Sequence, residues 1–203
     1  MMDERSLSAL PPDLPVPVDD GAAAHLPGTR IPHVALAATD GSVVDLAAIT
    51  GTVVVFGYPR TGRPGEPSLV ADWDQIPGAR GCTPEACAFR DHHADLRALG
   101  VEGVFGVSTQ DTDYQKEAVE RLHLPFEMLS DAELRLTRAL RLPTFEARGA
   151  TLVKRLTLVL RDGRVEHCFY PVFPTDTHAA EVVAWLRRQP QQQPPPAAIP
   201  SVV

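Results

Sequence analysis

The sequence has no long hydrophobic run and no excess of positive charge. None of its apolar stretches approaches the about 18 residues that a membrane-spanning helix needs. The 19 Lys and Arg residues are outnumbered by 26 Asp and Glu residues, and the formal net charge at pH 7 is −7. The chain therefore offers no basic field for nucleic acid or for an anionic lipid surface, and we expect neither as a partner.

Cysteine is also scarce, with three residues among 203. This density is far below that of a disulfide-stabilised secreted domain. The first residues, MMDERSLSALPPDLP, carry acidic side chains and lack the basic and apolar regions of a signal peptide. We therefore expect a cytoplasmic protein, in a reducing compartment where closely spaced thiols are more often catalytic or metal-binding than structural.

Proline and glutamine mark the two ends of the chain. Residues 1–29 contain five prolines and no helical or strand periodicity, which predicts an extended arm that is at best partly ordered. Residues 189–203 are uncharged and rich in Pro and Gln, which is typical of a disordered tail. Residues 30–188 remain, and their length fits one domain.

Hydrophobic patterns within residues 30–188 predict an α/β domain. Strands are expected in a hairpin over 33–49 that turns at Asp40-Gly41, in buried runs over 52–58 and 101–109, and in a hairpin over 151–172 that turns at Asp162-Gly163. Amphipathic or capped segments predict helices over 82–99, 111–124, 130–142 and 175–189. This order indicates a thioredoxin-like fold, a central mixed β-sheet flanked by helices, with an added N-terminal β-hairpin.

Two of the three cysteines lie in residues 78–87, GARGCTPEAC. Thr83 as N-cap and Pro84 at the first helical position would place Cys82 at a helix N-terminus. The positive end of the helix dipole favours a thiolate there, so we expect a lowered pKa for Cys82. Cys87 follows one and a half turns later, about 7.5 Å along the axis, too far for a disulfide unless the turn unwinds.

Other interpretations of these thiols have to be weighed. Both could be inert core residues, as we interpret Cys168, which lies within a predicted strand. A zinc site could use Cys82, Cys87 and His92 or His93, but this spacing matches no usual structural zinc pattern and lacks a fourth ligand.

The segment GCTPEACAFRD, residues 81–91, resembles the active-site segment of peroxiredoxins of the bacterioferritin-comigratory, or Q, type. Further similarities follow in the family's order: PHVALAATDGSVVDLAAITG to its N-terminal hairpin, VFGVST and LPFEMLSD to a strand and loop, and KRLTLVLRDGRV to a later hairpin. The resemblance covers about residues 30–187.

This resemblance implies a thiol peroxidase that reduces hydrogen peroxide and organic hydroperoxides. Cys82 would be the peroxidatic cysteine, Cys87 the resolving cysteine that forms an intrachain disulfide, and Arg155 the cation that holds the thiolate and polarises the peroxide. Glu85 matches the motif, but acidic residues are favoured at helix starts anyway, and we assign it no chemical role. Thioredoxin or a similar dithiol would be the reductant, no metal or other cofactor is implied, and we expect a monomer or a weak homodimer.

The sequence departs from the family motif P-x-x-x-T-x-x-C, because Ala79 stands three residues before Cys82. The counterparts of the motif's Pro and Thr would be Pro59 and Thr61, followed by an insertion over about residues 62–80. Thr61 would then supply the hydroxyl that contacts the peroxide; alternatively Thr83 serves, or the role is vacant. Trp73 and Asp74 in the insertion either form a lid or pack on the surface.

Two other functions remain in competition with a peroxidase. The altered Thr motif leaves room for a redox-sensing or interaction module on the same scaffold. A disulfide oxidoreductase is disfavoured because the chain lacks a C-x-x-C motif.

Overall fold

The computed structural model describes residue 7 and residues 9–189. The predicted tail over 189–203 therefore lies, except for its first residue, outside the described residues. Within the described part of the chain, no helix is long and apolar enough to cross a membrane.

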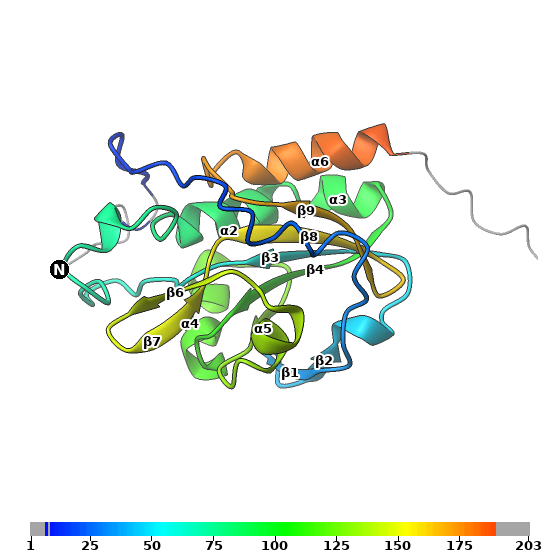
Figure 1. Cartoon of the computed structure of the whole chain (residues 1–203), viewed down its shortest axis with the longest axis horizontal. Coiled ribbons are helices and arrows are strands. Elements are labelled where there is room, and N and C mark those ends of the chain that lie inside the picture. The colour runs from blue at the N-terminus through cyan, green and yellow to red at the C-terminus, as the bar shows by residue number, and fades with distance from the viewer. Residues whose placement is uncertain (1–6, 8, 190–203) are drawn as a thin grey trace, which may run out of the picture.

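A seven-stranded mixed sheet forms the centre of the molecule, in the order β2-β1-β5-β4-β3-β8-β9 (Figure 1). Its strands are β1 (Ala35–Ala38), β2 (Val43–Asp45), β3 (Thr52–Gly57), β4 (Val101–Ser108), β5 (Met128–Ser130), β8 (Leu156–Arg161) and β9 (Arg164–Phe169). β3 is parallel to β4 and antiparallel to β8, and every residue of β3 is buried, as its continuous apolar sequence predicts. Both predicted hairpins, β1–β2 and β8–β9, are confirmed.

Helices cover the sheet on both faces. They are α2 (Cys82–Asp91), α3 (His93–Ala98), α4 (Thr112–Leu122), α5 (Arg135–Leu140) and α6 (His178–Arg188), with short 3₁₀ turns at Leu46–Ala48 and Trp73–Gln75. Phe89 of α2, Leu96 of α3 and Val182 of α6 share one apolar cluster with Phe56 of β3. On the other face, Leu136 of α5 packs in a second cluster with Leu158 of β8. This is the predicted thioredoxin-like fold with an added N-terminal hairpin.

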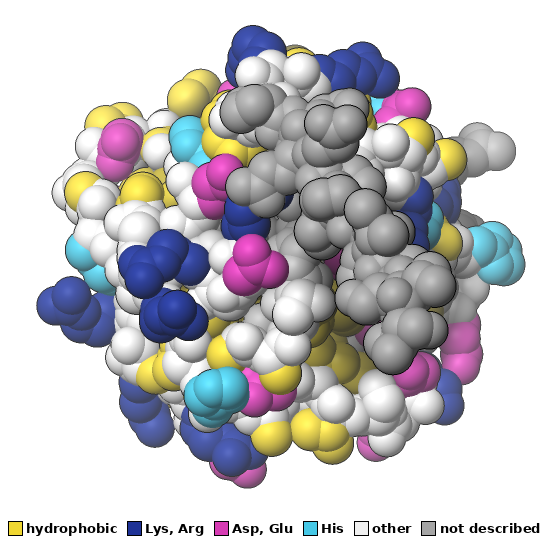
Figure 2. Space-filling view, turned by 90° about the vertical axis from the view of Figure 1, so that its right-hand side faces the viewer, with side chains coloured by type: hydrophobic (Ala, Val, Ile, Leu, Met, Phe, Trp, Pro, Cys, Tyr) yellow, Lys and Arg dark blue, Asp and Glu magenta, His cyan; other side chains and the backbone are white. Residues whose placement is uncertain are grey.

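Basic and acidic side chains are interspersed on the outside. On the face drawn in Figure 2, the Lys and Arg side chains of the described residues are mixed with Asp, Glu and hydrophobic side chains rather than gathered into one region. A surface of this kind carries no large field of one sign.

Three local predictions were wrong. The helix predicted over 82–99 is divided at His92, which ends α2 and precedes α3. The helix predicted over 130–142 is reduced to α5, because the Asp131 carboxylate accepts hydrogen bonds from the backbone N–H groups of Leu136 and Thr137 at its start. Residues 151–153 do not continue into the β8–β9 hairpin.

These residues belong instead to β7 (Ala150–Val153), which pairs with β6 (Thr144–Ala147) in a separate two-stranded sheet. The chain passes from the small sheet to the central sheet at Lys154, whose backbone N–H donates to the carbonyl of Pro143 at 2.8 Å. Arg155 therefore lies at a junction between strands rather than within one.

The end of the N-terminal arm packs against the domain. Leu26 is completely buried and completes the apolar cluster that contains α5. The ring of His25 hydrogen-bonds the carbonyl of Leu140 at 2.9 Å. Burial of apolar side chains at the arm's end explains why its proline content did not keep it away from the domain.

Candidate active site

Helix α2 begins at Cys82, and Gly81 is its N-cap residue. Gly81 has φ +107°, and a Cβ atom there would lie 2.4 Å from Oγ1 of Thr175, so this position requires glycine. Thr83 is the second helical residue and Pro84 the third, so the prediction that Thr83 caps the helix was wrong. Cys82 still lies at the positive end of the helix dipole, as predicted.

Arg155 contacts the sulfur of Cys82 from the protein interior. The side chains of both residues are buried, and Nη2 of Arg155 donates to Cys82 Sγ at 3.0 Å. The same Nη2 also donates to the carbonyls of Ala79 and Arg80, at 3.4 and 3.3 Å. The junction after β7 and the chain entering α2 together hold the guanidinium in place.

Glu85, to which we assigned no chemical role from its sequence position, is part of this site. It is completely buried, and its Oε2 forms an ion pair with Nη1 of Arg155, while its Oε1 has no hydrogen-bond partner among the described residues. Glu85 lies three residues after Cys82 on the same helix, a spacing that places both on one face, and this was the available signal. Burial raises the pKa of Glu85 to about 7, against the lowering effect of Arg155.

The expected low pKa of Cys82 is contradicted. Burial raises the pKa of this thiol above its ordinary value, and the Glu85 carboxylate adds to the shift. The Arg155 charge and a hydrogen bond from the Arg60 backbone act in the opposite direction. The position of Cys82 near a helix N-terminus and the cation beside it agree with the expectation from the sequence, but the depth of burial was not anticipated.

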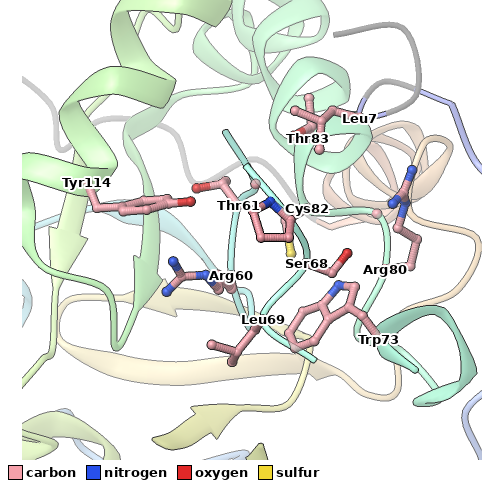
Figure 3. A pocket seen from close by; sticks show the side chains of 13 residues that line it. Leu7, Arg60, Thr61, Ser68, Leu69, Trp73, Arg80, Cys82, Thr83 and Tyr114 are labelled. Atoms are coloured by element: carbon pink, nitrogen blue, oxygen red, sulfur yellow. The ribbon is translucent and has the colours of Figure 1, made fainter. Parts of the chain in front are cut away.

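Thr61 lies in the same pocket as Cys82, although 20 residues separate them in the sequence (Figure 3). Thr61 is fully buried, and its backbone N–H and hydroxyl both donate to Oε1 of Gln110, at 2.9 and 3.1 Å. The Arg60 backbone, one residue earlier, hydrogen-bonds the Cys82 sulfur. Residues 60 and 61, which end the segment before residue 62, therefore lie next to Cys82 in the folded protein. Thr83 also lines this pocket.

Residues 62–80 form a roof over the pocket that is attached on two sides. On one side, Arg63 donates to the carbonyl of Asp113 at 3.2 Å, and Arg121 of α4 donates to the carbonyl of Gly62 at 3.1 Å. On the other side, Trp73 packs with Ala147 and Leu152 of the β6–β7 sheet. Trp73 is buried and lines the pocket, so it is part of the roof and not a surface residue. Asp74 pairs with Arg80 at 3.4 Å.

The described lining of the pocket comes from the N-terminal arm, the loop after β3, the roof, the start of α2 and α4. It consists of Leu7, Arg60, Thr61, Gly62, Pro67, Ser68, Leu69, Trp73, Arg80, Gly81, Cys82, Thr83 and Tyr114. Figure 3 shows the Cys82 sulfur between Tyr114 and Arg60 on one side and Trp73 and Arg80 on the other. Cys82 is therefore reached through a pocket with both charged and apolar walls.

Cys87 and Cys168 are both free and partly buried. Cys87 lies in the middle of α2 and packs against the apolar cluster that contains Phe89, which is closer packing than its sequence position suggested. Burial raises the pKa of Cys87, and burial together with Asp19 raises that of Cys168 to about 12. In the described part of the chain, no three His, Cys, Asp or Glu side chains are grouped so that they could hold a metal ion.

Comparison with known proteins gives consistent results. A family model described as Redoxin matches residues 26–184. The chloroplastic peroxiredoxin Q of Oryza sativa subsp. japonica is 32% identical over 162 residues, which cover 79% of this chain and 66% of that protein. Peroxiredoxin Bcp of Escherichia coli K12 is 28% identical over 165 residues, covering 79% of this chain and 94% of that protein.

Among solved structures, the crystal structure of peroxidoxin BcpB from Mycobacterium tuberculosis has a TM-score of 0.64 at 27% identity, covering 80% of this chain and 97% of that chain. The chain spans about two thirds of the length of the rice relatives it matches, 66%. Since the family model covers most of the sequence, the chain belongs to the redoxin family, and within it to the peroxiredoxins of the Q, or bacterioferritin-comigratory, type.

Proposed function

We propose that this protein is a thiol peroxidase that reduces hydrogen peroxide and organic hydroperoxides, with Cys82 as the peroxidatic cysteine. The observation that carries the proposal is the contact between Cys82 Sγ and Arg155 Nη2 at 3.0 Å, at the start of a helix and at the wall of a pocket. A thiolate is the reactive form of cysteine, and a fixed cation and a helix N-terminus both favour it. Family membership supports the same activity.

In the first step, the Cys82 thiolate attacks the terminal oxygen of the hydroperoxide. A sulfur–oxygen bond forms while the oxygen–oxygen bond breaks, and the departing alkoxide takes up a proton to become an alcohol, or water when the substrate is hydrogen peroxide. Sulfur is oxidised by two electrons to a sulfenic acid, and the peroxide is reduced by two. Arg155 stabilises the negative charge on sulfur before the attack.

In the second step, the Cys87 thiol attacks the sulfenic sulfur of Cys82, forming an intrachain disulfide and releasing water. Cys82 and Cys87 are both within α2, about 7.5 Å apart along an intact helix axis, so this helix has to unwind at its start. A dithiol such as thioredoxin then reduces the disulfide and restores both thiols. Cys168 takes no part in this cycle.

Thr61 is the residue that we propose for orienting the peroxide. It lines the pocket together with Cys82, and its hydroxyl is held by Gln110. The hydroxyl oxygen can still accept a hydrogen bond from a bound hydroperoxide while its own hydrogen is directed at Gln110.

The peroxide consumption of the purified protein tests the function. We expect steady turnover of hydrogen peroxide with thioredoxin and thioredoxin reductase, complete loss in Cys82→Ser, and wild-type turnover in the matched control Cys168→Ser. A Cys82→Ser variant that keeps the wild-type rate, or a wild-type protein that consumes no peroxide, would refute the proposal.

A redox-sensing role is the second candidate, and the buried, raised-pKa thiol of Cys82 favours it. A sensor would react with peroxide once and resist reduction by thioredoxin. The number of turnovers per protein molecule therefore separates the two functions.

All three cysteines are free, which agrees with a reducing compartment, and we infer a cytoplasmic location.

A further inference from the structure

The charged side chains that line the Cys82 pocket, among the described residues, are all positive. Among the described residues that line it, Arg60 and Arg80 are the charged ones, and both are cationic. The chain as a whole has a net charge of −7, and the outer face in Figure 2 mixes both signs. Arg80 is paired with Asp74 at 3.4 Å, so the charge that can act on a ligand here is that of Arg60.

Arg60 is held in place without being neutralised. Its guanidinium lies 4.4 Å from the centre of the Tyr114 ring and hydrogen-bonds the hydroxyl of that tyrosine. None of the ion pairs among the described residues involves Arg60, and its side chain is only partly buried. Tyr114 is an uncharged partner, so the positive charge of Arg60 remains available to a ligand in the pocket.

Arg63 provides the contrast. Its guanidinium also lies over the Tyr114 ring, 3.9 Å from the centre, but Arg63 is paired with Glu66 at 3.8 Å and Glu117 at 4.0 Å. Arg63 is not among the described residues that line the pocket. Of the two arginines that stack on the Tyr114 ring, Arg60 is the one that lines the Cys82 pocket and takes part in no ion pair among the described residues.

We propose that the pocket selects hydroperoxides that carry a carboxylate, and that Arg60 is the residue that determines this specificity. A guanidinium binds a carboxylate through charge-assisted hydrogen bonds. The peroxide group of such a substrate lies at Cys82, its carboxylate at Arg60, and its short alkyl part against Leu69 and Trp73, which line the same pocket. This inference rests on the proposed peroxidase function and adds the chemical class of its preferred substrate.

The test compares 3-hydroperoxy-3-methylbutanoate with its methyl ester, two hydroperoxides that differ in charge at nearly the same size. We expect the wild-type protein to show a higher kcat/KM for the acid. Arg60→Gln should lower the value for the acid by about 10- to 100-fold, the scale of a charge-assisted hydrogen bond, and should leave the value for the ester within about threefold. Arg63→Gln, the matched control, should leave the ratio of acid to ester unchanged.

Salt provides a second measurement. Raising the ionic strength should reduce the rate with the acid and not the rate with the ester, because exposed charges are screened within a Debye length of about 8 Å at physiological salt. Equal kcat/KM for acid and ester in the wild-type protein, or an equal loss for both in Arg60→Gln, would overturn the inference while leaving the peroxidase function intact. A protein that reduces neither substrate nor hydrogen peroxide would refute the peroxidase function itself.

Discussion

The guanidinium of Arg155 lies between the sulfur of Cys82 and the carboxylate of Glu85, with Nη2 3.0 Å from Sγ and Nη1 paired with Oε2 of Glu85. All three side chains are buried, so their charges act on one another with little screening by water. Arg155 is shared between two acidic groups. A change in the charge of one group therefore changes the pKa of the other, because both interact with this single cation.

Removing the charge of Arg155 and removing the charge of Glu85 should therefore shift the pKa of Cys82 in opposite directions. Burial and Glu85 raise the pKa of Cys82 while Arg155 lowers it. Alkylation of Cys82 by iodoacetamide should accelerate as the pH rises through the pKa of the thiol. We expect Arg155→Met to move this profile to higher pH and Glu85→Gln to move it to lower pH. Profiles that coincide with that of the wild-type protein would show that the three groups do not interact electrostatically.

Stability should show the same coupling. Arg155→Met leaves Glu85 buried without its cation, and we expect a loss of about 3–5 kcal/mol in the free energy of unfolding near pH 8. Since the folded-state pKa of Glu85 is about 7 with Arg155 present, and the cation lowers it, the variant's value should be higher still. The protonated form of Glu85 is then favoured in the folded state. The contribution of Glu85 to the free energy of unfolding is therefore greatest below the pKa that Glu85 has in the unfolded chain, and it falls as the pH rises through the folded-state pKa.

Urea unfolding at pH 5 and pH 8 measures this effect. The loss in Arg155→Met should shrink at pH 5, where Glu85 is protonated, and the double variant Arg155→Met/Glu85→Gln should recover much of the stability at pH 8. Peroxidase activity should not recover in the double variant, because the cation next to Cys82 is still absent. Recovery of activity together with stability would place Arg155 in a purely structural role.

Paired variants can distinguish the contributions of Thr61 and Thr83 to peroxide turnover. Thr61→Val removes the hydroxyl that Gln110 holds, and we expect peroxide turnover to fall by about 10²-fold or less, the scale of one oriented polar contact. Thr83→Val has the same change of shape at another position of the same pocket and should have a smaller effect on turnover. The reverse order would assign the hydroxyl contact to Thr83.

Oxidation should unwind the start of α2. One equivalent of peroxide is expected to form a Cys82–Cys87 disulfide and to leave Cys168 as a thiol, as read by peptide mass spectrometry. Amide exchange should increase in residues 82–88, while α3 beyond His93 stays protected. Because Cys87 packs partly against the core, this opening should be slower than simple fraying of a helix end.

In Cys87→Ser, the first reaction with peroxide should remain, turnover with thioredoxin should stop, and Cys82 should be oxidised further to sulfinic acid. A Cys82–Cys168 bridge, or a bridge between two chains, would show that Cys87 is not the resolving cysteine.

Local sequence determined the elements with strong patterns and the position of Cys82 near the start of a helix. The apolar run of residues 52–58 specified a fully buried strand, Asp40-Gly41 and Asp162-Gly163 specified two turns, and the CTPEAC segment indicated a helix that begins near Cys82, although not its N-cap residue. These features depend on hydrophobic periodicity and on short-range backbone chemistry, which neighbouring residues encode directly.

Only the tertiary structure decided what surrounds Cys82. The burial that raises the pKa of the thiol, the ion pair between Arg155 and Glu85, and the return of Thr61 to the pocket all join segments that lie far apart in the chain or depend on the depth of burial. The attachment of residues 62–80 to α4 and to the β6–β7 sheet likewise depends on contacts between distant segments. Periodicity and motif spacing describe one segment at a time, whereas desolvation and charge pairing are set by all the elements that pack around a group.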